Sequence, residues 1–142
     1  MNNDLHDYRY GELAVGMKEE FFYEVTAERM EMFRVLTGDE NPLHCEKHYA
    51  RDRGFDDRVV YGMLHASLFS TMAGMYLPGK NSLLEHVDVQ FAKPVYVGEK
   101  LRVCGQIMEK NDKYRRIAVK MAIYNEKDSK VCRGKMEIGV LA

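Results

Sequence analysis

Cysteine is scarce in this sequence, and its copies form no motif. Cys45, Cys104 and Cys132 are an odd number without C-x-x-C spacing, which argues against both a disulfide framework and a zinc knuckle. We therefore expect three reduced thiols. Proline is equally scarce, with three residues, and neither a low-complexity linker nor an internal repeat marks a domain boundary. The 142 residues are predicted to form one domain, residues 1–142.

The sequence also lacks an excess of charge of either sign. Its 21 Lys and Arg residues and 22 Asp and Glu residues give a net charge of −1, so nucleic acid and anionic membrane surfaces are not expected partners. No apolar run approaches bilayer-spanning length, and residues Met1–Asp7 carry acids where a signal peptide has a basic region. We expect a cytoplasmic protein that does not contact a membrane.

Three segments are predicted to be helical. Thr26 offers a hydroxyl N-cap to residues 27–36, whose apolar side chains recur every three positions up to Leu36. A second short helix is expected at residues 46–53. The strongest helical pattern covers residues 61–77, which leave few polar positions. This long helix should therefore be apolar nearly all round and largely buried.

Strand-like runs dominate the second half of the chain. Short turn-like connections separate the last four, which favours antiparallel pairing because parallel strands need longer crossovers. The predicted fold class is α+β, a single hot-dog fold in which a curved antiparallel sheet wraps around the long central helix. Such a sheet leaves edges unpaired, and a homodimer is the expected way to cover them. The five predicted strands are residues 20–25, 83–91, 100–109, 115–124 and 131–140.

Residues 39–44, with the sequence DENPLH, are the strongest candidate for chemistry. Asp39 and His44 place a carboxylate and an imidazole five residues apart across a proline-containing turn, where functional residues are over-represented. The alternative is an ordinary turn, because Asn-Pro two residues after Asp is common in turns. Spacing alone leaves both interpretations open. His44 and His48 lack a third ligand, so no metal site is expected.

A family resemblance favours the catalytic interpretation of this motif over the ordinary turn. Residues 37–44 resemble the hydratase signature of the MaoC-like family, which includes the (R)-specific enoyl-CoA hydratases. The similarity covers most of the chain and continues in the same order through residues 49–50, 54–55, 62–70, 77–80 and 91–99. It implies a lyase that interconverts a trans-2-enoyl thioester of coenzyme A or acyl carrier protein and the (3R)-hydroxyacyl thioester, with no metal or redox cofactor.

The resemblance also implies roles for individual residues. Asp39 and His44 would bind the water that is added, and Gly62 would give its backbone N–H to the thioester carbonyl. Protonation or deprotonation beside a thioester develops enolate-like charge on that oxygen, which a backbone donor at a helix N-terminus stabilises. The sequence does not say which of Asp39 and His44 is the base. A role for Gly62 in tight helix packing alone is also open.

Three further residues are expected in the substrate-binding region. Asn41 would fix the turn, and Ser70 matches a polar helix position near the family's active site, although a hydroxyl bonded back to the preceding turn is equally open. Tyr61 stands where relatives commonly have His. A phenol donates a hydrogen bond but does not titrate near pH 7, so a role of that His in orienting the Asp would put activity in doubt.

Two other functions remain open at this point. A thioesterase would share the fold and the acyl-thioester pocket, and a non-catalytic acyl-binding module would need no proton-transfer pair.

Among the isolated histidines, His65 is expected at the surface or as a core residue with satisfied hydrogen bonds. Lys80 and Lys93 are candidates to meet the phosphates of coenzyme A.

Overall fold

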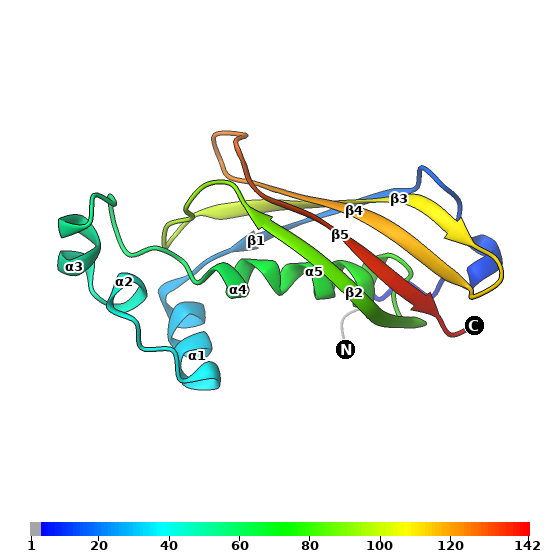
Figure 1. Ribbon diagram of the computed structural model, residues 1–142, viewed down its shortest axis with the longest axis horizontal. Coiled ribbons are helices and arrows are strands. Elements are labelled where there is room, and N and C mark those ends of the chain that lie inside the picture. Colours follow the sequence, from blue (N-terminus) through cyan, green and yellow to red (C-terminus); the bar gives the residue numbers. More distant parts are fainter. Residues whose placement is uncertain (1–3) are drawn as a thin grey trace.

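The computed structural model describes residues 4–142, so the first three residues of the acidic N-terminal segment lie outside the described residues. A five-stranded antiparallel sheet with the order β1-β3-β4-β5-β2 curves over a central helical segment (Figure 1). Each predicted strand is present, with ends within two residues of the prediction, and the α+β hot-dog layout is confirmed. The strands are β1 (Lys18–Glu24), β2 (Ser82–Phe91), β3 (Lys100–Asn111), β4 (Arg116–Tyr124) and β5 (Lys130–Val140).

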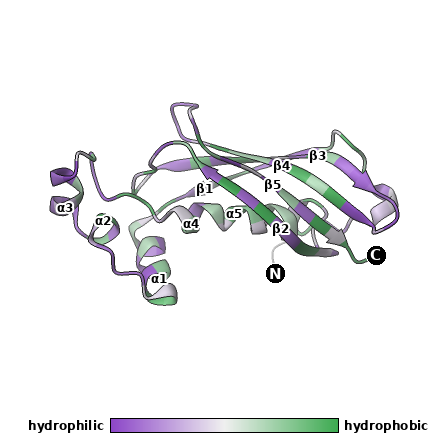
Figure 2. Ribbon diagram, in the orientation of Figure 1, coloured by the Kyte–Doolittle hydropathy of each residue, from purple (hydrophilic) through white to green (hydrophobic). Residues whose placement is uncertain are grey.

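Alternation along β3 and β4 creates the core. Successive side chains of a strand point to opposite faces of the sheet, and Leu101, Val103 and Ile107 are fully buried on the inner face. Arg102 and Cys104 lie between them on the outer face, which is more polar. The same alternation of hydrophobic and hydrophilic residues is visible along the strands in Figure 2.

The central helical segment is not the single regular helix predicted for residues 61–77. It consists of α4 (Gly62–Ala66), α5 (Leu68–Thr71) and the π-helical η2 (Met72–Tyr76). The first break falls at Ser67, whose hydroxyl donates a hydrogen bond to the Leu64 carbonyl at 2.5 Å. Bonds of this type compete with the helical pattern and bend helices.

Burial of this segment is also less complete than predicted. Phe69 and Met72 are buried against the sheet, but Met63 is 65% exposed. The close approach depends on two glycines of the sheet. A Cβ at Gly105 would lie 2.9 Å from Met72 Cγ, and one at Gly134 would lie 2.7 Å from Phe69 Cε2. Glycine in a strand often marks such a site of close approach.

Three short helices project beyond one end of the sheet (Figure 1). In α1 (Ala27–Thr37), the Thr26 hydroxyl accepts the Arg29 N–H at 3.1 Å, which confirms the predicted N-cap. Next come α2 (Pro42–Cys45), a single turn that was not predicted as helix, and α3 (Lys47–Asp52). Near the N-terminus lies the 3-10 helix η1 (Tyr10–Glu12).

The apolar face predicted for the first helix is partly wrong. Met30 is buried and Phe33 is half-buried, but Leu36 is 81% exposed, together with Met32 and Val35. Positions 32, 35 and 36 share a helical face, so α1 presents an uncovered apolar strip. Within residues 4–142, no helix is both long and apolar enough to cross a membrane.

Candidate active site

The turn at residues 39–44 is held by its own polar side chains. The Asp39 carboxylate accepts the Asn41 N–H at 3.1 Å, and the Asn41 side-chain oxygen accepts the Leu43 N–H at 3.0 Å. Asn41 thereby caps α2, with Pro42 in the first helical position, where its missing N–H costs nothing. The structure agrees with the expected role of Asn41 in fixing the turn, while its contact with a substrate stays a prediction.

His44 has a defined tautomer in this arrangement. Its Nδ1 lies 2.7 Å from the Val59 carbonyl oxygen. A carbonyl only accepts hydrogen bonds, so Nδ1 carries a hydrogen and the neutral ring leaves Nε2 unprotonated. His44 Nε2 is therefore the atom of this residue that can take a proton.

Tyr61 links the histidine to the aspartate. Its ring stacks on His44 with 4.2 Å between centroids and 30° between planes, and its hydroxyl donates to the Asp39 backbone carbonyl at 2.6 Å. The side chain is only 3% exposed. Burial, followed by the interaction with Cys45, raises the Tyr61 pKa, so the phenol stays protonated. Tyr61 thus holds the backbone of the motif in place.

A recess of about 270 Å³ connects His44 with the start of α4. Gly62, His65, Phe91 and Lys93 share its wall, together with apolar residues of the two neighbouring loops. The Gly62 N–H forms no hydrogen bond within residues 4–142 and is free to meet a ligand. A Cβ at Gly62 would lie 3.1 Å from Phe91 Cε1. The packing explanation for this glycine is therefore also consistent with the structure.

Four predicted site residues, Asp39, Asn41, Tyr61 and Ser70, are not in the wall of this recess. Asp39 is exposed, and no hydrogen bond joins its carboxylate to His44 in the described part of the chain. Ser70 is also exposed, and within residues 4–142 its hydroxyl does not form the bond to the preceding turn that was the alternative to a site role; Ser67 forms such a bond instead. Participation of Asp39 and Ser70 in chemistry or binding stays a prediction.

His65 was missed as a candidate. It was expected at the surface or with satisfied hydrogen bonds, but it is 2% exposed and neither ring nitrogen has a hydrogen-bond partner in the described structure. Burial lowers its pKa to about 4, so the ring is neutral near pH 7. Its position three residues after Gly62 placed it on the same helical face, which was the signal available in the sequence.

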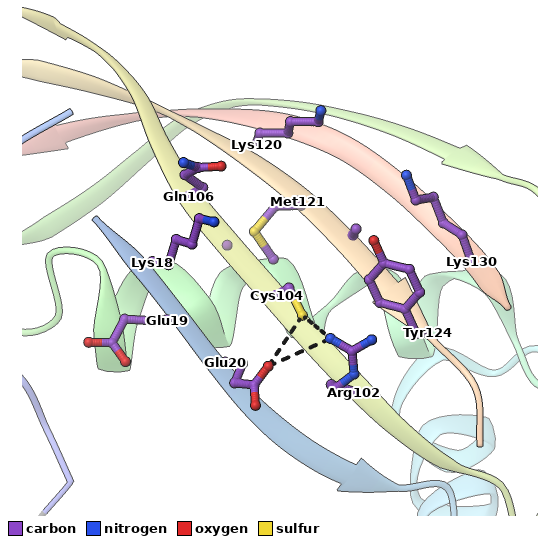
Figure 3. A pocket seen from close by; sticks show the side chains of 12 residues that line it. Lys18, Glu19, Glu20, Arg102, Cys104, Gln106, Lys120, Met121, Tyr124 and Lys130 are labelled. Carbon is purple, nitrogen blue, oxygen red and sulfur yellow. Dashed lines mark hydrogen bonds and ion pairs between the residues drawn. The ribbon is translucent and has the colours of Figure 1, made fainter. Parts of the chain in front are cut away.

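A larger hollow of about 570 Å³ lies on the outer face of the sheet, between β1, β3 and β4 (Figure 3). Among the charged side chains of its wall, Glu20 lies 3.6 Å from Arg102. Burial raises the Cys104 pKa, so this thiol is protonated at neutral pH. The hollow has no imidazole in its wall and offers no group poised for proton transfer near pH 7.

Metal ligation finds no support in the described residues. Across residues 4–142 there is no group of three or more His, Cys, Asp or Glu side chains able to hold an ion. His48, the second member of the H-x-x-x-H spacing, is on α3 and lies 3.4 Å from the Asp52 carboxylate.

Comparison with known proteins adds independent information. The family described as the MaoC like domain matches residues 13–130. The chain belongs to the MaoC-like domain family. The (R)-specific enoyl-CoA hydratase of Aeromonas caviae is 38% identical to this MaoC-like protein over 89 residues, which are 63% of this chain and 66% of the relative. The 3-hydroxybutyryl-CoA dehydratase of Methylorubrum extorquens is 30% identical over 100 residues, 70% of this chain and 64% of the relative.

The matched segments thus span just under two thirds of those two curated relatives. A solved structure covers this MaoC-like protein more fully. The unliganded R-hydratase of Pseudomonas aeruginosa superimposes with a TM-score of 0.90 at 29% identity, over 96% of this chain and 87% of the other. The predicted family and the predicted fold are both confirmed.

Proposed function

We propose that this protein is a lyase that adds water to trans-2-enoyl thioesters to form (3R)-hydroxyacyl thioesters, or catalyses the reverse reaction. The observation that carries the proposal is the shared recess, in which His44, with Nε2 free to accept a proton, lies near the unbonded Gly62 N–H. A proton acceptor and a carbonyl donor are the two groups that this reaction needs. The names of the two curated relatives support the same chemistry.

In the proposed mechanism, Asp39 and His44 hold one water molecule beside the β-carbon of the enoyl group. His44 Nε2 takes a proton from this water as its oxygen bonds to the β-carbon. The electron pair of the double bond moves toward the thioester carbonyl, whose oxygen accepts the Gly62 N–H. A proton then returns to the α-carbon on the same face, which completes syn addition and regenerates the neutral imidazole. No step needs a metal or a redox cofactor.

We propose that two copies of the chain form a homodimer. Exposed apolar side chains support this proposal, because they gather on the edge strand β2 (Leu83 and Val87) and on the uncovered face of α1. A second copy would also shield the exposed Asp39 from bulk water. Sedimentation velocity should give a dimer at micromolar concentration; a fully active monomer at all concentrations would contradict the proposal.

We further propose that residues 1–142 form one domain and that the protein acts in the cytoplasm. The family match ends at residue 130, but β5 lies beyond it and pairs with both β4 and β2. Removing β5 would expose the middle of the sheet, which supports a domain that includes it. The three free thiols are consistent with a reducing compartment. Cell fractionation tests the location.

The carrier of the acyl group is proposed to be coenzyme A or acyl carrier protein. Lys93 supports recognition of a phosphate, because it lines the recess and makes no salt bridge in the described structure. Lys80 is less suited, since it lies 3.7 Å from the Asp7 carboxylate. A binding site for coenzyme A phosphates is therefore better supported at Lys93.

Two assays on one reaction mixture test the proposed activity. Crotonyl and longer enoyl-CoA substrates should lose their enoyl absorbance, while a thiol reagent should detect no released coenzyme A. Release of thiol without hydration would favour the thioesterase. Binding without either change would favour the non-catalytic module, and both results would contradict the hydratase.

A further inference from the structure

His65 differs from the other histidines of the described chain because its ring is both buried and without a partner. It is 2% exposed, and neither Nδ1 nor Nε2 forms a hydrogen bond. A polar group buried in this way loses its hydration without compensation. Such groups are rare in native proteins and require an explanation, of which an absent ligand is one.

The surroundings of His65 indicate which ligand atom would meet it. His65 and Gly62 are three residues apart on one face of α4 and line the same recess as His44. The Phe91 ring covers both positions. It lies edge-on to the His65 ring, with 5.5 Å between centroids and 90° between planes, and 3.1 Å from the site of a Gly62 Cβ. A group bound at Gly62 is thus a neighbour of His65.

Phe91 is placed where it can move aside. It is the last residue of the edge strand β2 and is 50% exposed. Rotation of its ring would open a path from the recess to both the Gly62 N–H and the His65 imidazole.

The ionisation state of His65 suits a hydrogen-bond donor. Burial lowers its pKa to about 4; the backbone of Tyr61 opposes this shift, but without a hydrogen bond of good geometry to either nitrogen. The ring is therefore neutral near pH 7 and carries one N–H. Neutral imidazoles can polarise a substrate carbonyl, and they avoid the desolvation penalty of a buried cation.

We propose that His65 is a further catalytic residue: its imidazole N–H donates a hydrogen bond to the thioester carbonyl oxygen, beside the bond from the Gly62 N–H. This inference rests on the proposed hydration of enoyl thioesters. Negative charge grows on that oxygen while water adds to the β-carbon and disappears when the α-carbon is protonated. A donor at this position therefore stabilises the transition state more than the bound substrate.

The kinetic test compares His65→Leu and His65→Gln with the parent on crotonyl-CoA. Loss of one donor to such an oxygen typically costs 10²–10³-fold, so we expect His65→Leu to lower kcat by roughly 10²-fold and to change KM by less than about three-fold. Gln keeps an N–H donor and should recover part of kcat. The matched control is His48→Leu, since His48 is an exposed histidine on α3 that lies 3.4 Å from the Asp52 carboxylate; it should behave like the parent.

A binding measurement separates carbonyl contact from a structural role. The thioester 4-(dimethylamino)cinnamoyl-CoA absorbs at longer wavelength when its carbonyl is polarised, so the parent should shift its spectrum and His65→Leu should shift it less. Because the leucine also removes two unsatisfied nitrogens, its Tm should equal or exceed that of the parent. Lower kcat, a smaller spectral shift and an undiminished Tm together are not expected from a packing defect.

The possible outcomes distinguish this inference from the proposed function. If the parent hydrates crotonyl-CoA and His65→Leu matches it in kcat and in spectral shift, His65 is not a donor and the hydratase proposal stands. If the parent does not hydrate but its spectral shift depends on His65, the carbonyl contact is supported and the hydratase proposal is wrong.

Discussion

Two of the hollows in the described structure, the outer hollow on the sheet and the recess at α4, differ in the chemistry of their walls. The outer hollow on the sheet is about 570 Å³ and the recess at α4 about 270 Å³. In the outer hollow, Arg102 pairs with Glu20 and with Asp128, and the wall contains lysines and carboxylates but no imidazole. In the recess, His44 Nε2, the Gly62 N–H and both His65 nitrogens have no hydrogen-bond partner among residues 4–142.

This difference explains why the smaller cavity is the candidate active site. An imidazole that can accept a proton and an unbonded N–H beside a cavity can act on a substrate, and the wall of the outer hollow has no imidazole. The sheet supports the outer hollow with regular strands whose polar groups face water. The recess lies where a turn, a loop and an irregular helix meet, and irregular backbone is where functional residues concentrate.

The largest effect should follow from removing the two proposed proton-transfer groups, His44 in the recess wall and Asp39 on the neighbouring turn. We expect Asp39→Asn and His44→Gln each to lower kcat by roughly 10²–10⁴-fold, the usual contribution of a positioned acid or base. Stopped-flow loss of enoyl absorbance measures the change, with circular dichroism to confirm folding. If both variants fold and hydrate at near-parent rates, the recess is not the active site.

The next largest loss of activity should come from Gly62, in the wall of the recess. In Gly62→Ala, the new Cβ would meet the Phe91 ring and displace a bound carbonyl, so we expect kcat to fall by about 10²-fold. Adding Phe91→Ala separates the two explanations for this glycine. If Gly62 only relieves packing, the double variant should regain parent activity; if the close approach of substrate matters, it should not.

A smaller effect is expected at the link between the turn and the helix. Tyr61→Phe removes the hydroxyl bond to the Asp39 carbonyl, and we expect the free energy of unfolding to fall by about 1 kcal/mol. Urea titration measures this change. In Tyr61→His we expect no large gain in activity. A rise in turnover of about 10²-fold or more would show that the tyrosine disables this chain and would favour the non-catalytic module.

Lys93→Ala should have a modest effect on binding alone. One exposed ion pair contributes up to about 1 kcal/mol, so KM for coenzyme A substrates should rise by roughly three-fold while kcat is unchanged. The matched substrate is a pantetheine thioester, which lacks the nucleotide phosphates and should show no change. Equal effects on both substrates would contradict a phosphate contact.

The smallest effect is expected in the outer hollow. Lys120→Gln and Cys104→Ala should leave kcat and KM within about two-fold of the parent and stability within about 0.5 kcal/mol. A loss of kcat comparable to that of His44→Gln would indicate that the outer hollow, and not the recess, is the active site.

Most of the architecture could be predicted because it depends on local rules. Alternation in 100–109 and 115–124 gave strands in the right places, and the cap at Thr26 marked a helix start. The break at Ser67 could not be predicted, because a hydroxyl bonded within a turn leaves no periodic signal. The exposure of Leu36 could not be predicted either. It depends on which elements pack against α1, and the sequence of α1 does not show this.

The candidate site was also predicted only in part, because some of its features depend on contacts between residues that are distant in the sequence. His44 and Gly62 were found through a motif, and the tautomer of His44 emerged only from its contact with Val59, 15 residues away. His65 was overlooked because its proposed role depends on a buried ring without partners in the described structure, and a sequence does not show which polar groups remain unbonded. Its spacing from Gly62 was the one available sign.

Turnover of the double variant Asp39→Asn/His44→Gln tests the central claim most directly. If the two residues hold and deprotonate one water, either loss abolishes the same step, and the double variant should be within about three-fold of the poorer single variant. Two independent factors that multiply, or single variants that hydrate enoyl thioesters at parent rates, would contradict a shared water at this recess.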